Sequence, residues 1–330
     1  MPLPTLTSVY IDRPLTNMSI AYNQDPKVAG FARRMFPVVQ VPEKTGKYFT
    51  FPKAAWFRNE MQLRTPGAKP AEIGFTVSND SFSCDQYGVA HVMPDEIKKS
   101  FQAQPDADFY ASGLLSMKAM IRENVSFASE FMTTSVWSTD ITGVSSGEND
   151  STTIRQWNDS ASDPIKWLKA AMRAVHKAIG RKANKIGMGA EVWDALSIHP
   201  DMVGSLPDSS PKIFTEADFE KMFGLPAGGL VVMDAVYNTA AEGQTASMSY
   251  VAGKHCLVCY ASPSPAIAEP SAGYIMHYDE FGVGVAKDGA VAIERHRRDE
   301  EHADVFQAFT SFDLKATATD AGYFFSSIVA

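Results

Sequence analysis

The stretch Thr45–Asp95 reads TGKYFTFPKAAWFRNEMQLRTPGAKPAEIGFTVSNDSFSCDQYGVAHVMPD, and it decides how the rest of the chain is organised. Its outgoing limb, Lys47–Phe51, is aromatic and extended. Its returning limb, Ile73–Val77, alternates apolar and polar residues, which is typical of a half-buried strand. A polar tip that contains Pro66-Gly67 lies between the limbs and carries turn signals. The stretch therefore predicts one long two-stranded hairpin.

The hairpin carries more aromatic surface than a free ribbon keeps stably in water. Its eight large aromatic residues are Tyr48, Phe49, Phe51, Trp56, Phe57, Phe75, Phe82 and Tyr87. Leaving all of them exposed would forfeit about 10–20 kcal/mol as an upper bound. That figure exceeds the net stability of most domains, roughly 5–15 kcal/mol. Two arrangements stay open from the pattern alone: a hairpin folded onto its own domain, or an arm that lies across a neighbouring copy of the chain.

The composition describes a core-forming chain of one large domain or two ordinary ones. The 330 residues are 45% hydrophobic and 21% charged. No apolar run is long enough to span a bilayer, and the N-terminus lacks a secretory pattern, so we expect synthesis in the cytosol and no membrane partner. Three cysteines argue against a disulfide framework. The net charge of −8 argues against a dedicated nucleic-acid-binding protein.

The segments on either side of the hairpin differ in pattern. Residues 1–42 contain six prolines and scattered apolar residues, which predicts an extended arm without a core of its own. Beyond the hairpin, a long helix is predicted over Asp108–Ser135. Its apolar stripe is Leu114, Met117, Ile121, Val125, Ala128 and Met132. Residues 138–162 are rich in Ser, Thr, Gly and Asp, which predicts a loop and a domain boundary.

The second half of the chain alternates helices and strands. Asp163-Pro164 begins a helix that Gly180 ends, and Thr215 with Asp218 forms the start signal of another. Short strands are predicted over 185–188, 230–233, 247–251, 256–260 and 274–277, with a hairpin over Asp288-Gly289 and extended pieces over 303–314 and 323–329. The first helix carries four cations on its outer face: Lys166, Lys169, Arg173 and Lys177. We interpret them as a solvated face rather than a polyanion site.

Two groups of residues are candidates for a metal site or a catalytic site. Cys256 and Cys259 form a CxxC pair, but positions three apart on a strand face opposite sides, so two buried small residues are favoured over a zinc site. His296 and His302 flank a charged run of mixed sign, Arg295–Glu301. A salt-bridged surface is favoured there over a catalytic His–carboxylate pair. We expect no catalytic residue, no metal site and no cofactor.

A run of ordered matches resembles the major capsid proteins of tailed bacteriophages. The strongest stretch is NKIGMGAEVWDALSIHP, Asn184–Pro200, where a strand and glycine lead into a helix. The other matches are Thr215-Glu216, Met222-Phe223-Gly224, Val231-Val232 and Ala235–Ala240, and in the first part of the chain Ile11–Thr16, Phe36–Val39, Gly46–Phe49 and Arg64–Gly67. They cover most of the chain in order, although no single motif is chemically specific.

The resemblance implies an α+β fold of the Hong Kong 97 type. Its expected parts are an N-terminal arm (1–42), an extended hairpin loop (43–93), a peripheral domain with a spine helix (94–160), an axial domain (161–300) and a return to the peripheral domain (301–330). In that family the hairpin lies over a neighbouring subunit. The residues expected to make this intersubunit contact are Lys47, Tyr48, Phe49, Trp56, Phe57, Arg58 and Arg64.

The resemblance also implies the function. We expect a major capsid protein that self-assembles into hexamers and pentamers of an icosahedral phage head, enclosing double-stranded DNA without specific binding. Because the chain starts directly at the arm, a separate scaffolding protein is expected, together with a portal and, in some phages, a decoration protein. The alternatives are an α/β enzyme that uses His296 and His302, and another structural phage protein such as a decoration or tail component.

Overall fold

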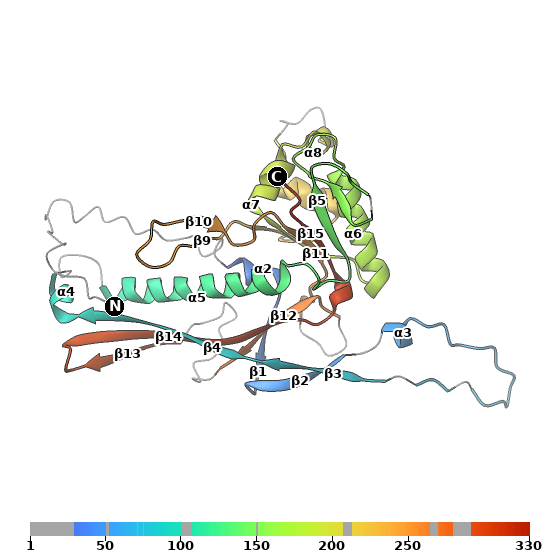
Figure 1. Ribbon diagram of the computed structural model, residues 1–330. Coiled ribbons are helices and arrows are strands. Elements are labelled where there is room, and N and C mark those ends of the chain that lie inside the picture. The colour runs from blue at the N-terminus through green and yellow to red at the C-terminus, as the bar shows by residue number, and fades with distance from the viewer. Residues whose placement is uncertain are drawn as a thin grey trace.

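A computed structural model describes residues 30–50, 53–70, 72–74, 76–100, 107–149, 151–206, 213–264, 270–279 and 292–330. Most of the predicted N-terminal arm lies outside the described residues. So do Phe51, Phe75 and the hairpin predicted over Asp288-Gly289. Within the described ranges the chain builds two large sheets with helices packed on them and two small two-stranded sheets, and a long arm projects from one side (Figure 1).

The first sheet has six strands in the order β6-β5-β15-β11-β7-β8. Their bounds are β5 Asp140–Val144, β6 Thr153–Arg155, β7 Lys185–Gly189, β8 Leu230–Met233, β11 Cys256–Cys259 and β15 Gly322–Ser326. Strand β11 is buried along its whole length, because α6 (Pro164–Ile179) packs on β11 and β15. The prediction of a loop over 138–162 is wrong in part, since β5 and β6 lie there. Strand β5 pairs in parallel with β15, and β6 pairs in parallel with β5, which the polar composition does not reveal.

The second sheet is built around β14 (Ala303–Ala316), a strand of 14 residues. One end of β14 pairs with β13 (Ala292–Arg298), the other with β12 (Gly273–Tyr278), and β4 (Asp85–Pro94) runs along its second edge. Strand β1 (Val38–Val41) adds to β12 in parallel. The long helix α5 (Ala107–Phe131) lies along this sheet (Figure 1), and Leu115 packs with Met93 and Phe306 between them.

Helix α5 confirms the predicted long helix and part of its predicted stripe. Met117 and Met132 are buried and Ile121, Val125 and Ala128 are half-buried, whereas Leu114 is 47% exposed. The buried residues Leu115, Phe127 and Phe131 lie outside the predicted stripe. The prediction also missed that α2 (Phe31–Met35), a short helix from the N-terminal part, packs on α5 and buries a polar residue there. Its Arg33 donates to the carboxylate of Glu123 at 2.5–3.0 Å.

The predicted helix ends are confirmed where the side chains specify them. Helix α6 begins with Pro164 and ends at Gly180, which has a left-handed φ of 70°. Thr215 and Asp218 form a reciprocal capping box at the start of α9 (Glu216–Phe223). The shorter elements are α4 Asp95–Ser100, α7 Ala190–Ser197, α8 Pro200–Gly204, β9 Val236–Asn238, β10 Met248–Tyr250 and the 3₁₀ turn η3 Thr319–Ala321. Among the described residues, no helix is both long enough and apolar enough to cross a membrane.

Candidate functional site

The arm, residues 45–83, begins with a short ladder. Strand β2 (Thr45–Thr50) pairs with β3 (Ser78–Ser83) in antiparallel register, from Thr45 opposite Ser83 to Thr50 opposite Ser78. The outgoing limb is therefore a strand, as predicted. The returning strand is not where the alternation placed it, because residues 72–74 and 76–77 have no regular structure and β3 starts at Ser78. With no sheet face to cover them, Ile73 and Val77 are 72% and 46% exposed.

One hydrogen bond across the ladder fixes an aromatic residue of the arm. The Tyr48 hydroxyl donates to Asp80 Oδ2 at 2.9 Å. Burial raises the pKa of the Tyr48 hydroxyl, and the neighbouring Asp80 carboxylate raises it further. The pKa of Asp80 is lowered by the backbone N–H of Ser81 and by Tyr48. The base of the arm is thus held together by its own polar contacts.

A second set of contacts ties the arm to the body of the same chain. After β2 the chain forms α3 (Lys53–Trp56), a single turn of helix that the sequence pattern did not predict. Lys53 Nζ forms an ion pair with Asp320 Oδ2 at 2.5 Å. The ring of Phe57 lies 3.1 Å from where a Cβ on Gly180 would be. The arm therefore leaves the body beside the C-terminal end of α6.

Beyond these contacts lies the arm tip, residues 57–77, which touches water on most sides. Its large apolar side chains, and that of Trp56 before it, are highly exposed: Trp56 65%, Phe57 64%, Met61 96%, Leu63 105% and Ile73 72%. Monomeric proteins rarely leave so many large apolar residues exposed together, and such surfaces mark interaction sites. Within the part of the chain that the structure describes, these side chains are therefore left uncovered.

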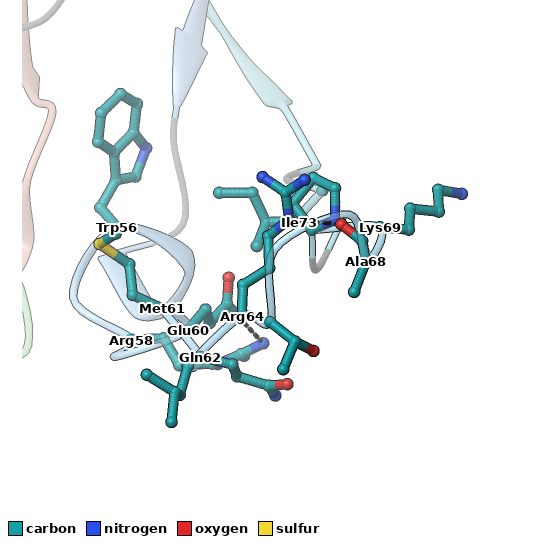
Figure 2. Close-up of a pocket in the computed structure, with 13 residues that line it drawn as sticks. Trp56, Arg58, Glu60, Met61, Gln62, Arg64, Ala68, Lys69 and Ile73 are labelled. Carbon is teal, nitrogen blue, oxygen red and sulfur yellow. Dashed lines mark hydrogen bonds and ion pairs between the residues drawn. The ribbon is translucent and has the colours of Figure 1, made fainter.

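The tip encloses a half-open hollow of about 690 Å³. Figure 2 shows the two sides of the loop around it, with Trp56 and Met61 on one side and Ile73 on the other. Short-range polar contacts shape the loop: Arg58 pairs with Glu60 at 2.9 Å, and Arg64 Nε donates to the Ala68 carbonyl. The loop thus exposes apolar side chains, and the contacts of Arg58 and Arg64 hold its backbone in this conformation.

The structure brings the seven predicted contact residues together on the arm. Lys47, Tyr48 and Phe49 lie on β2, Trp56 ends α3, and Phe57, Arg58 and Arg64 lie in the tip. Only Tyr48 is half-buried against its own chain; the other six are exposed. The sequence reasoning treated the tip as polar and missed Met61 and Leu63. An apolar pair inside a segment bounded by charged residues and Pro66-Gly67 is the signal that would have found them.

The charged run of the alternative site forms an exposed ladder on β13. Arg295 pairs with Asp304 at 2.7 Å, Arg297 with Asp95 at 2.6 Å and Arg298 with Glu301 at 3.3 Å. Burial alone would raise the pKa of Asp304, but hydrogen bonds from Lys98 and Arg295 outweigh that and lower it. His296 is exposed on the same strand, and His302 lies in the turn that follows it. The predicted salt-bridged surface is confirmed.

The CxxC pair is buried, as predicted. Cys256 and Cys259 have no exposed surface on β11. Burial raises the pKa of both thiols, that of Cys259 to about 12, so both are protonated at neutral pH. In the part of the chain that the structure describes, no three His, Cys, Asp or Glu residues are placed to hold a metal ion.

Comparison with solved structures finds proteins with a similar fold. No family model matches the chain, and no curated protein matches it in sequence. A phage-related protein from Bordetella bronchiseptica RB50 is 19% identical with a TM-score of 0.65, over 94% of this chain and 99% of that one. The capsid of cyanophage P-SCSP1u is 9% identical with a TM-score of 0.59, over 97% and 93%.

The same architecture is also found outside phage capsids. The SrpI encapsulin complex from Synechococcus elongatus PCC 7942 is 9% identical with a TM-score of 0.55, over 99% of this chain and 96% of that one. These likenesses span nearly the whole of both chains. The chain therefore has the α+β capsid fold of the Hong Kong 97 type.

Proposed function

We propose that this chain is the major capsid protein of a tailed phage. Copies of it would self-assemble into hexamers and pentamers of an icosahedral head that encloses double-stranded DNA. The observation that carries the proposal is the arm tip, which is pre-shaped, apolar and uncovered in the single chain. The shared fold with phage capsids supports the proposal, as does the 19% identity with a phage-related protein.

The arrangement of the arm favours a second copy as its partner. A hairpin folded onto its own domain would bury its aromatic residues there, but Phe49, Trp56 and Phe57 are each more than 60% exposed. The described contacts between the arm and the chain's own body lie near the base: Lys53 pairs with Asp320, Phe57 lies beside Gly180, and the Ser83 N–H donates to Asp313. Tyr48 and Phe82 also pack beside Met276 there. Burying a large apolar side chain is worth roughly 1.5–3 kcal/mol, so several from each tip would bind a neighbour firmly when repeated around a shell.

The geometry of such a contact leads to a closed lattice. A tip that covers a different surface of the next subunit makes a head-to-tail contact, and repetition of that contact forms rings when the rotation closes. Within this proposal the seven predicted residues make the contact, with Met61 and Leu63 beside them. The division of the chain into arm, hairpin, peripheral and axial parts stays a prediction from the family resemblance.

The proposed role is structural rather than catalytic: the protein is synthesised in the host cytoplasm and is located in the virion. The enzyme alternative required a concave pocket around His296 and His302, whereas β13 presents these charges on an exposed ladder. Separate scaffolding, portal and decoration proteins remain partners expected from the family. A decoration or tail component would differ from a capsid protein in the geometry of its particles.

Electron microscopy of the expressed chain, alone and with candidate scaffolding proteins, tests the proposal. We expect closed shells with icosahedral symmetry. Tubes, isolated rings or monomers under every condition would contradict it. The likeness to an encapsulin complex favours a second candidate, a shell with other contents. Particles purified from the phage or prophage source decide between them, because nuclease-protected double-stranded DNA is expected only for the phage head.

A further inference from the structure

The outer face of α6 carries a strip of uncompensated positive charge. The basic stripe, defined as Lys166, Lys169, Arg173 and Lys177, recurs at spacings of three and four residues, so it follows one face of the helix for about 16 Å. All four side chains are exposed. Arg181 and Lys182 follow directly, and there is no Asp or Glu from residue 164 to 190. This segment is thus strongly cationic within a chain of net charge −8.

The stripe does not stabilise the helix that carries it. Like charges at such spacings repel by about 0.2–0.5 kcal/mol per pair. Lys166 and Lys169 are also near the N-terminal end, where the helix dipole disfavours cations, so only Lys177 is favourably placed. Lys166 Nζ lies 5.5 Å from the ring centroid of Trp167. No carboxylate in the described ranges forms an ion pair with Lys169, Arg173 or Lys177.

The position of the stripe relates it to the arm. Phe57 of the arm contacts Gly180, the residue that ends α6, and η3 next to α6 provides Asp320 for the ion pair with Lys53. In Figure 1, α6 lies on the side of the first sheet from which the arm projects. A neighbouring copy that receives the arm would therefore lie on the side of the stripe.

Exposed carboxylates on two elements lie on the other side of the same sheet, which we call its acidic side. Helix α7 and the β9–β10 connection, residues 239–247, lie across the sheet from α6 (Figure 1). Asp194 on α7 and Glu242 in the connection are exposed, and Glu191 pairs only loosely with Lys254 at 3.8 Å. A head-to-tail contact needs two different surfaces on opposite sides of one subunit. A basic and an acidic side meet that requirement with complementary charge.

We propose that the basic stripe of α6 docks on the acidic side of a second copy, formed by α7 and the β9–β10 connection. The proposal rests on the proposed function, because it adds a second contact between the copies that the arm joins. The contact sets the register of neighbouring subunits, since like charges oppose one another when the subunits are shifted or inverted. It also makes assembly sensitive to salt, which the apolar tip alone does not.

Charge reversal in the full chain tests the proposal under conditions in which the wild type forms shells. The variant Lys169→Glu/Arg173→Glu should raise the subunit concentration needed for assembly by about tenfold or more. Asp194→Lys/Glu242→Lys should do the same, and the four substitutions combined should restore assembly toward the wild-type level. The neutral variant Lys169→Gln/Arg173→Gln should have a smaller effect. Lys118→Glu/Lys221→Glu, which changes the net charge equally at other exposed sites, should assemble like the wild type.

Light scattering and microscopy measure assembly, and circular dichroism melting shows that each variant folds. Normal assembly of both reversed variants, or failure of the combined variant to recover, would overturn the proposal. Normal shells that retain less nucleic acid would assign the stripe to a polyanion instead, which also overturns it. A wild-type chain that forms no particles under any condition would refute the proposed function itself, and this proposal with it.

Discussion

The interior of the body and the arm tip use the same residue types in opposite ways. Phe127 and Phe131 on α5 have no exposed surface, and their ring centroids lie 5.5 Å and 4.7 Å from that of Phe36. Trp56 and Phe57 are about two thirds exposed, although they are equally apolar. The body buries these aromatic side chains in its own core, whereas those of the tip stay exposed. The difference indicates that the body supplies the stability of the subunit and the tip supplies contacts with other molecules.

Removal of the tip should have the largest effect, because it tests whether the body folds without the tip and whether shells form without it. Deletion of residues 55–70 should leave a soluble, folded subunit that forms no shells, because those residues add almost nothing to the body and carry the proposed contact. Electron microscopy measures shell formation, and circular dichroism confirms that the deletion variant retains the wild-type helix content. Normal shells from this variant would refute the proposed role of the arm.

Two substitutions of aromatic residues, one in the body and one beside the tip, compare how much each region contributes to the stability of the subunit. Phe131→Ala should lower the free energy of unfolding by about 3–5 kcal/mol, because it leaves a cavity between α5 and Phe36. Trp56→Ala removes a larger side chain but should change the same quantity by no more than about 0.5 kcal/mol in unassembled subunits. Urea denaturation followed by circular dichroism gives both values. Equal losses from the two substitutions would show that the arm packs on its own body in solution.

Features set by nearby residues were predicted from the sequence, whereas features set by residues far along the chain were not. Local signals placed the helices well, as with Pro164 and Gly180 at the ends of α6 and the capping box of α9. Long-range pairing was missed, because β5 pairs with β15, a strand about 180 residues away, and β6 in turn pairs with β5. The burial of Glu123 on α5 was missed for a similar reason, because its partner Arg33 lies 90 residues away.

The arm contains both a feature that the sequence predicted correctly and one that it predicted wrongly. The sequence identified the arm and six of its exposed residues but missed Met61 and Leu63, because aromatic content and turn signals are local properties whereas the tip was treated as polar. The strand predicted at Ile73–Val77 was wrong because alternation alone does not reveal whether a second surface is present to bury it. Among the residues that the structure describes, none provides such a surface for Ile73 and Val77, which are 72% and 46% exposed.

The contact between Phe57 and Gly180 tests how firmly the arm base rests on the body. Gly180→Ala should cost about 1–2 kcal/mol, because φ of 70° places an alanine in the left-handed region. Since Phe57 is largely exposed and free to move, the same substitution in a Phe57→Ala background should cost nearly as much. Denaturation of the two single variants and the double variant measures the coupling energy. A coupling above about 1 kcal/mol would show a rigidly docked base.

The ion pair at the arm base gives the smallest expected effect, and it depends on pH. The hydrogen bond from Lys53 lowers the pKa of Asp320, and one from Ser138 adds to it. A carboxyl group with a lowered folded pKa stabilises the fold above its unfolded value of about 3.9, and this is lost as pH falls through the folded value. Because both side chains are partly exposed, the pair is worth less than about 1 kcal/mol.

Amide hydrogen exchange of α3 measures this contact. Protection should be constant from pH 7 to about pH 5 after correction for intrinsic rates, and should fall below about pH 4. Asp320→Asn should show the weaker protection at every pH. Loss of protection near pH 6 in the wild type would assign the tether to another group.

The position of the tip in an assembled particle tests the central claim most directly. A cryo-electron microscopy map of shells formed by the full chain would show which atoms surround Trp56, Met61 and Leu63. The account predicts that all three lose most of their exposed surface against a neighbouring subunit, while α5 and both sheets keep their present packing. A shell in which the three side chains stay in solvent, or fold back onto their own subunit, would contradict it.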